Sequence, residues 1–370
     1  MSFKQNYRLR KPGGKYTVGC MKFEYEYESE DTKSKRRIPC LCFYPSSESG
    51  DSKDAKEYAS SRVFPGFSGI YTNSYWDIPL LAGKHPFLLF STGLGSYLEQ
   101  NTVQFEELAS NGYIVLSIGH EGSTSFELKN GEICLWDSQE AYVEENKNSQ
   151  EKIKPYKKWF EENSNAASVE EKRHKYLEYV ASLTYRTPLL DIWVKDGLVT
   201  LERLFDSNDE ESARIRTHID REKVAAFGMS FGGSMAFRLA VESDFIKAGV
   251  SMDSTIYWTP DWEGTIDKPF MSIHADSLAT PSLKDVMPLL SPTSDFYSVT
   301  IRDCSHVNFT DYSEILEVDE NRILGSIDPD VMERIMSTLI LDFFNKYFKP
   351  EPSEYLDTGF WDDYAVVSKR

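Results

Sequence analysis

The chain has 370 residues, of which 40% are apolar and 14% aromatic, and its formal net charge is −18. This apolar content is enough for a large core and excludes a disordered or low-complexity chain. The strong negative charge argues against a nucleic-acid backbone, or an anionic membrane surface, as the main partner.

The N-terminal and cysteine patterns predict a cytoplasmic protein. The first residues lack the apolar stretch of a secretory signal, and the longest apolar runs are far shorter than the ~20 residues of a membrane span. The five cysteines are an odd number without a C-x-x-C motif, at a density far below that of a disulfide scaffold. We therefore expect buried free thiols, Cys40 and Cys42 among them, and no stable membrane insertion.

The predicted elements begin with two β-rich runs and a loop. In residues 16–27, aromatic side chains alternate with Glu24 and Glu26, which indicates a half-exposed antiparallel edge strand. A second run covers residues 37–44, and the polar residues of 46–56 predict a loop. Together these runs form an N-terminal β extension.

From residue 86 onward, short apolar strands alternate with helical stretches. Because these strands are apolar on both faces, they predict a mostly parallel sheet covered by helices, as in the α/β class. The expected strands cover residues 87–90, 113–117, 224–227, 248–252, 270–273 and 297–301. Two helices have marked starts, since Thr187 and Asp328 are each followed by a proline and predict an N-cap with a first-turn proline.

Residues 121–186 interrupt the sheet pattern with a charged, helix-prone segment. We interpret this segment as a helical insertion over the sheet, within one domain that covers residues 1–370. A solvated helical excursion without a role in binding explains the segment equally well. The tail of residues 349–370 is acidic and aromatic, and its sequence indicates no function.

The most informative motif is Gly228-Met-Ser-Phe-Gly232, a G-x-S-x-G sequence between an apolar strand and a helix-prone run. A serine in such a turn is strained, so the residues two before and two after it must be small. The turn raises the Ser230 hydroxyl above the sheet, beside a helix N-terminus whose free N–H groups stabilise an oxyanion. We therefore predict that Ser230 is a nucleophile.

A serine nucleophile needs a base, and the base needs an orienting acid. The predicted base is His306, just beyond the strand that ends near residue 301; His274 is the second candidate, although a core or rim position explains it more simply. Two acids, Asp253 and Asp276, each follow an apolar strand. The strand positions leave this choice open, and the generic α/β-hydrolase layout favours the later residue.

The oxyanion hole requires two backbone N–H donors. One is expected from Phe231, directly after the nucleophile, and the other from Leu94 in the glycine-containing loop of residues 91–96. This loop lacks the third glycine and the acidic ribose ligand of a dinucleotide site. The six histidines are dispersed, without an H-E-x-x-H motif or a close Cys/His cluster, so we expect no cofactor and no metal.

Several separated stretches of the chain occur together in one family of esterases. They are Gly14-Lys-Tyr-Thr-Val-Gly-Cys20, Phe43-Tyr-Pro-Ser46, Gly93-Leu-Gly95, residues 219–223, Ser230-Phe-Gly-Gly233 and His306-Val-Asn-Phe-Thr-Asp311. In this order they resemble the plasma-type platelet-activating factor acetylhydrolases, also called lipoprotein-associated phospholipases. The resemblance covers most of the chain. It implies an α/β-hydrolase fold and a calcium-independent serine esterase that cleaves short or oxidised sn-2 acyl groups from phospholipids.

The same resemblance bears on individual residues. It selects Asp253 as the acid, and it matches Leu94 and Phe231 to the oxyanion donors of the family. This chain has Thr92 and Met229 where the family usually has histidine, and neither position belongs to the catalytic triad.

The sequence as a whole predicts a carboxylic ester hydrolase that works through an acyl-serine intermediate. Its expected substrate is a small-molecule ester or a phospholipid, with Ser230, Asp253 and His306 as catalytic residues. An esterase of another substrate class, for xenobiotic, polyester or acetyl-sugar esters, is the first alternative. A hydrolase-like binding protein without turnover is the second.

Overall fold

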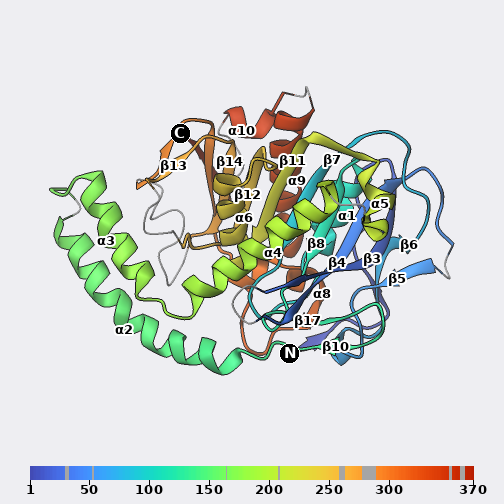
Figure 1. The fold of residues 1–370 in the computed structure, drawn as a ribbon, viewed down its shortest axis with the longest axis horizontal. Helices are drawn as coiled ribbons and strands as arrows, with labels where there is room; N and C mark the ends of the chain where they lie inside the picture. The colour runs from blue at the N-terminus through green and yellow to red at the C-terminus, as the bar shows by residue number, and fades with distance from the viewer. Residues whose placement is uncertain are drawn as a thin grey trace.

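The computed structural model describes residues 1–29, 33–51, 54–163, 165–206, 209–257, 263–276, 289–349, 352–358 and 363–370. One large β-sheet runs through this part of the chain, and helices cover both of its faces (Figure 1). The sheet has 12 strands in the described ranges, in the order β18-β16-β14-β12-β11-β7-β8-β4-β3-β6-β2, with β5 paired to β6.

The centre of the sheet is parallel. Its strands are β7 (His85–Ser91), β8 (Ile114–Ile118), β11 (Ile219–Met229), β12 (Ala248–Met252), β14 (Phe270–Ala275) and β16 (Phe296–Ile301). Each of them contains one of the expected apolar runs or most of it, and neighbouring strands pair in parallel. Because helices cover both faces, every residue of β7, β8, β12 and β14 is buried. The predicted mostly parallel sheet is confirmed.

The N-terminal extension continues this sheet with strands in both parallel and antiparallel pairings, apart from its first short strand, which lies outside the sheet. It comprises β1 (Ser2–Phe3), β2 (Tyr7–Arg8), β3 (Thr17–Glu28), β4 (Lys35–Ser46), β5 (Ala55–Glu57) and β6 (Ile70–Trp76). Strand β4 pairs with β3 on one side and with β8 on the other, both antiparallel. The prediction that residues 16–27 form an edge strand is wrong for the first part of β3. Residues 18–20 pair with β6, a strand that the sequence did not indicate.

The main helices form two layers, one on each face of the sheet. Helices α4 (Arg186–Asp206) and α6 (Phe231–Glu242) pack against one face, and α1 (Thr102–Ser110) and α9 (Pro329–Phe348) against the other. The shorter elements are α5 (Glu210–Arg216), α8 (Tyr312–Ile315), α10 (Glu354–Thr358), η2 (Pro65–Phe67) and η4 (His306–Phe309).

One of the two predicted helix starts is confirmed and the other is wrong. The Asp328 carboxylate accepts hydrogen bonds from Asp330 N and Val331 N, as expected for the N-cap of α9. Thr187 is not an N-cap, because α4 already begins at Arg186. The cap at this end comes from Glu145 of a different helix, whose carboxylate accepts from the backbone N–H groups of residues 185 and 186.

Between β8 and α4, the predicted insertion contains a hairpin and two helices. The hairpin is β9 (Phe126–Glu127) with β10 (Ile133–Cys134), and the helices are α2 (Gln139–Asn163) and α3 (Val169–Ala181). Figure 1 shows α2 and α3, drawn in green, projecting to one side of the sheet. The expectation that this segment lies over the sheet is therefore wrong for its helices.

Three of the remaining strands belong to two-stranded sheets that are separate from the main sheet. Short strand β13 (Thr265–Ile266) pairs with β15 (Ser291–Pro292), and β17 (Leu316–Val318) pairs with β1. The C-terminal tail contributes β18 (Ala365–Lys369), which extends the main sheet by pairing antiparallel with β16. All five cysteines lie in described ranges and are buried, and none of them forms a disulfide bond. Within the described ranges, no helix has the length and apolar character needed to cross a bilayer.

Candidate active site

The sharp turn between β11 and α6 holds Ser230. Its backbone has φ +56° and ψ −123°, and its N–H donates to Met252 O of the neighbouring strand at 2.8 Å. The flanking glycines allow close backbone approach. A Cβ atom on Gly228 would lie 2.3 Å from Gly232 O, and a Cβ atom on Gly232 would lie 2.0 Å from Ser91 O. The steric reason for the G-x-S-x-G spacing is thus visible in the backbone itself.

A histidine and an aspartate complete a hydrogen-bonded row with this serine. His306 Nε2 lies 3.0 Å from Ser230 Oγ, and His306 Nδ1 lies 2.6 Å from Asp253 Oδ2. The other carboxylate oxygen of Asp253 accepts from Ala275 N at 2.9 Å, which fixes the carboxylate. The Asp253 side chain is fully buried, whereas that of His306 is 45% exposed. We call Ser230, His306 and Asp253 the pocket cluster.

Parallel strands bring the pocket cluster together, because their carboxyl ends meet at one edge of the sheet. Ser230, Asp253 and His306 follow β11, β12 and β16 respectively. The two residues that the sequence left as alternatives lie elsewhere. Asp276 is exposed, and its backbone N–H donates to Ile301 O. His274 is buried within β14, with Nδ1 3.4 Å from Ser272 Oγ.

Ser230 and His306 open into a pocket of about 210 Å³. Its walls include three aromatic side chains from separate segments: Phe64 before η2, Tyr97 after the glycine-containing loop, and Tyr312 of α8. No sequence pattern had indicated these three aromatic residues as part of a site. Tyr312 follows the His306 motif by one residue, which is a usable local signal, whereas Phe64 reaches the pocket only through the tertiary fold.

The two N–H groups expected to form an oxyanion hole lie beside this pocket. Leu94 lines the pocket, and Phe231 is the first residue of α6. Among the hydrogen bonds of the described residues, neither backbone N–H has an acceptor. The loop around Leu94 is held by Gln100, whose Oε1 accepts from Gly93 N at 2.9 Å. Sequence reasoning did not find Gln100.

The two positions that depart from the family pattern are both buried. Thr92 is fully buried, and its hydroxyl donates to Gly93 O at 3.2 Å. Met229 is buried apart from the surface that it contributes to the pocket. Neither side chain contacts Asp253 or His306 through a hydrogen bond that the described residues show.

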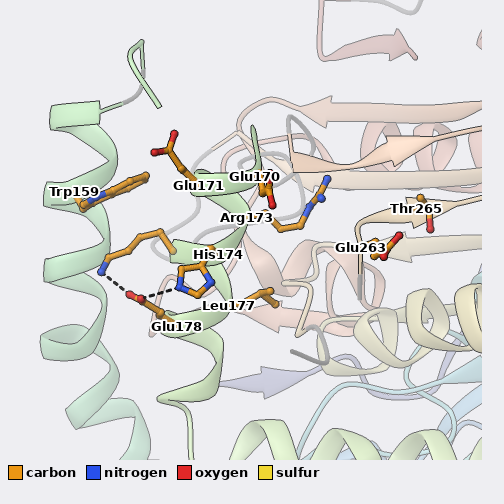
Figure 2. Close-up of a pocket in the computed structure, with 10 residues that line it drawn as sticks. Trp159, Glu170, Glu171, Arg173, His174, Leu177, Glu178, Glu263 and Thr265 are labelled. Atoms are coloured by element: carbon orange, nitrogen blue, oxygen red, sulfur yellow. Dashed lines mark hydrogen bonds and ion pairs between the residues drawn. The ribbon is translucent and has the colours of Figure 1, made fainter. Parts of the chain in front are cut away.

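A second, larger hollow of about 820 Å³ lies between α2, α3 and the segment of β13 (Figure 2). Charged side chains dominate its lining, including Glu178, which pairs with Lys175 at 2.6 Å and with His174 at 3.4 Å. Figure 2 shows Trp159 of α2 on the opposite side of the hollow from β13 residue Thr265. This hollow shares no lining residue with the pocket of Ser230.

The fold is that of solved α/β-hydrolases. A ferulic acid esterase from Streptomyces cinnamoneus superposes with a TM-score of 0.74 over 95% of this chain and 96% of its own, at 17% identity. The fold class is therefore that of the α/β-hydrolases.

Sequence comparison gives the family. Residues 1–355 match the model described as platelet-activating factor acetylhydrolase, isoform II, and the chain belongs to that family. It is therefore a carboxylic ester hydrolase. Platelet-activating factor acetylhydrolase of Canis lupus familiaris is 25% identical over 368 residues, which cover 92% of this chain and 77% of the dog protein. The Bos taurus protein of the same name is 22% identical with the same two coverages.

Proposed function

We propose that this enzyme hydrolyses esters with short or oxidised acyl chains, including sn-2 acyl groups of phospholipids, through an acyl-serine intermediate on Ser230. The observation that carries the proposal is the unbroken row of hydrogen bonds from Ser230 Oγ through His306 to a buried carboxylate. This order of serine, histidine and carboxylate is the one used in nucleophilic catalysis by a serine, which supports the proposal.

In the proposed reaction His306 Nε2 takes the proton of Ser230 as the serine oxygen attacks the ester carbonyl. The carbonyl oxygen becomes an oxyanion and accepts hydrogen bonds from Leu94 N and Phe231 N. His306 then passes the proton to the leaving alcohol, and in the second half it activates the water that releases the acid. Asp253 keeps the Nδ1–H tautomer and stabilises the imidazolium that forms.

The size of the pocket supports a short acyl group. A volume of about 210 Å³ lies below the ~300–1,000 Å³ of pockets that bury a drug-sized ligand. The aromatic walls formed by Phe64, Tyr97 and Tyr312 favour an apolar group of this size. The chain supplies every group that the reaction uses, so we propose catalysis without a cofactor, and we expect EDTA to leave turnover unchanged.

A fluorophosphonate probe tests the nucleophile. We expect it to label the purified wild-type enzyme and not Ser230→Ala. Ser298→Ala is the matched control, because it removes a buried serine hydroxyl from β16 without touching the pocket. Labelling of Ser230→Ala at the wild-type level would contradict the mechanism, and no labelling of the wild type would favour a binding protein without turnover.

An ester panel tests the substrate class. We expect kcat/KM to fall by more than about tenfold between p-nitrophenyl butyrate and decanoate, since even one misfitting methylene costs about 10–200-fold. A phosphatidylcholine with an sn-2 acetyl group should be cleaved faster than one with an sn-2 oleoyl group. Preference for acetylated xylose or a polyester over both phospholipids would replace this substrate class with one of the alternatives.

We further propose that the enzyme acts in the cytoplasm. The support is that no disulfide bond joins any of the five cysteines, all of which lie within the described ranges, as is usual in a reducing compartment. Fractionation of the native host should recover the activity with cytoplasmic markers, and recovery from the medium would contradict this location.

A further inference from the structure

A second Ser–His–Asp arrangement lies behind the loop that carries Leu94. His120 Nε2 is 2.9 Å from Ser91 Oγ, and His120 Nδ1 is 2.8 Å from Asp196 Oδ2. Ser91 ends β7, His120 follows β8 and Asp196 lies on α4. The three residues, which we call the buried cluster, are 2%, 0% and 0% exposed. No substrate reaches this serine, so the cluster is not a second hydrolytic site.

The charges around the buried cluster fix the histidine ring. Asp196 also accepts hydrogen bonds from Arg36 Nε at 2.8 Å and from Tyr27 Oη at 2.8 Å. Burial would raise the pKa of Asp196, but hydrogen bonds from His120 and Arg36 hold that pKa below its ordinary value. Burial lowers the pKa of His120. A neutral ring donates a hydrogen bond from Nδ1–H to Asp196 and accepts one at Nε2 from the Ser91 hydroxyl.

The buried cluster holds both ends of the loop that carries Leu94. At its start, the side chain of Ser91 contacts His120 directly. At its end, Gly95 N donates to Ser123 O at 2.8 Å. Ser123 belongs to the turn that His120 begins, because Ser123 N donates to His120 O at 2.9 Å. The Leu94 N–H lies between these two attachments.

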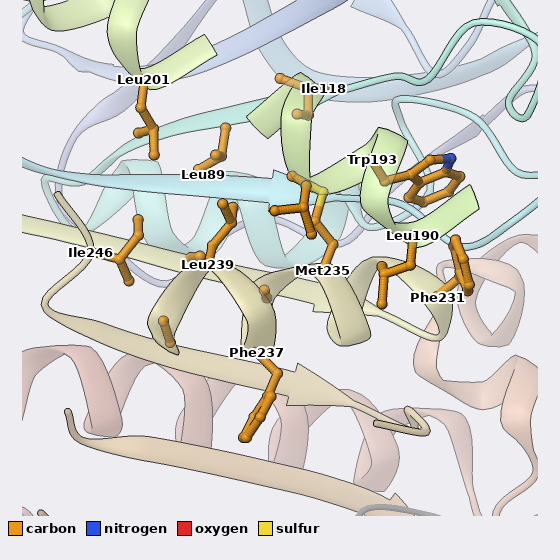
Figure 3. Close-up of a cluster of buried hydrophobic side chains, with 14 of the residues drawn as sticks. Leu89, Ile118, Leu190, Trp193, Leu201, Phe231, Met235, Phe237, Leu239 and Ile246 are labelled. Atoms are coloured by element: carbon orange, nitrogen blue, oxygen red, sulfur yellow. The ribbon is translucent and has the colours of Figure 1, made fainter. Parts of the chain in front are cut away.

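His120 is also connected, through Trp193, to Phe231, which carries the second expected oxyanion donor. The His120 ring stacks on Trp193, with centroids 3.7 Å apart and planes at 11°. Trp193 in turn meets the ring of Phe231 edge-on, at 4.8 Å and 84°, and Figure 3 shows these two side chains next to each other. His120 is thus connected to Leu94 through the loop and to Phe231 through Trp193.

We propose that His120 is a positioning residue that sets the two oxyanion donors relative to Ser230, with Ser91 and Asp196 fixing its ring. This inference rests on the proposed function, since it concerns the oxyanion hole of that same site. Donors aimed at a developing oxyanion act only if their geometry is held closely, and here that support comes from side chains behind the loop. His120 itself touches no substrate.

The test uses Ser91→Ala, which removes one hydroxyl, and His120→Phe, which keeps a ring against Trp193 but removes both nitrogens. With p-nitrophenyl acetate we expect kcat to fall about 10–100-fold in each and KM to change less than about threefold. This loss is smaller than the 10²–10³-fold cost of deleting a donor outright. The matched control is Ser298→Ala, whose hydroxyl lies 3.5 Å from Nε2 of the buried His274; its kcat should stay at the wild-type value.

A pair of inhibitors separates oxyanion support from general packing. A trifluoromethyl ketone adds Ser230 Oγ to its carbonyl carbon, with the serine proton passing to His306, and so forms an oxyanion. The corresponding methyl ketone binds largely without this addition. We expect Ser91→Ala and His120→Phe to weaken the trifluoromethyl ketone about 10–100-fold and the methyl ketone less than about threefold.

The inference is overturned if both folded variants keep kcat within threefold of wild type, or if both ketones weaken equally. Should His120→Phe fail to fold, Ser91→Ala decides alone, because it changes a single buried hydroxyl. Ser230→Ala on the same ester separates the two proposals. Full activity of Ser230→Ala overturns the proposed function, whereas an inactive Ser230→Ala beside a fully active Ser91→Ala overturns only the role of His120.

Discussion

The pocket cluster and the buried cluster contain the same three residue types in the same hydrogen-bonding order. Their histidine–serine distances are 3.0 and 2.9 Å, and their histidine–aspartate distances are 2.6 and 2.8 Å. Hydrogen-bond geometry alone therefore does not distinguish the proposed catalytic arrangement from the proposed supporting one.

Access and backbone conformation distinguish them. The side chain of His306 is 45% exposed and that of His120 is 0% exposed. Ser230 sits at φ +56° in a strained turn above the sheet, whereas Ser91 is the last residue of an extended strand. In addition, Arg36 balances the charge of Asp196, which makes the buried cluster a stable structural support rather than a poised base.

Exchanging the serine of each cluster for alanine gives the largest expected contrast. Ser230→Ala should lower kcat on a short-chain ester by about 10⁴–10⁶-fold, since the nucleophile acts as a unit with its base. Ser91→Ala should lower kcat only about 10–100-fold, because it removes support for the donors and not the nucleophile. Steady-state kinetics check the first effect and a thermal unfolding curve checks the fold. If Ser230→Ala keeps more than a few per cent of activity, the nucleophile is elsewhere.

The acid of the pocket cluster gives the next largest effect. Asp253→Asn should lower kcat by about 10³–10⁴-fold, because the wrong tautomer of His306 would dominate. Asp276→Asn is the matched control, as it follows the next strand and is exposed, and it should cost less than about tenfold. Both are measured on one ester. An inactive Asp276→Asn beside an active Asp253→Asn would reverse the assignment of the acid.

The sequence was enough to predict the central strands and the turn at Ser230, because short-range patterns determine both features. The apolar runs predicted the six central strands, and the glycines at 228 and 232 predicted the turn at Ser230. Strand position could not separate Asp253 from Asp276, since both follow buried strands. Only the resemblance to a known family favoured the residue that lies beside His306.

What the sequence did not indicate depends on partners far away in the chain. The N-terminus of α4 is capped by Glu145, some forty residues earlier, so a local cap at Thr187 was the wrong expectation. Strand β18 is recognisable only once β16 lies beside it. The buried cluster spans 29 residues from Ser91 to His120 and 76 from His120 to Asp196, and no local motif links such positions.

Replacing Asp196, the acid of the buried cluster, should mainly lower the stability of the fold. Asp196→Ala leaves Arg36, which is 15% exposed, without its charge partner, and we expect a loss of about 3–5 kcal/mol in the free energy of unfolding. The control on the same helix is Asp191→Ala, which removes an ion pair with Arg238. The Asp191 side chain is 57% exposed, so this ion pair should contribute at most about 1 kcal/mol to the free energy of unfolding. Urea unfolding of both variants provides the measurement. Equal losses would mean that the buried cluster is not a structural support.

The smallest effect concerns the protonation of the buried histidine. Burial lowers the pKa of His120 in the folded state. As the pH falls below about 6.5, His120 is therefore protonated in the unfolded chain while it is still neutral in the folded protein. The wild type should therefore lose up to about 1.4 kcal/mol of stability per pH unit from this residue alone. His120→Phe lacks that loss, so the stability difference between wild type and variant should shrink as the pH falls from 7.5 to 5.

Asp196 does not add to this pH dependence of stability between pH 7.5 and 5. Its pKa is held below its ordinary value, so its contribution to stability is lost only at a lower pH. Urea unfolding at four pH values tests this expectation, and a difference that stays constant with pH would show that His120 is not kept neutral by burial.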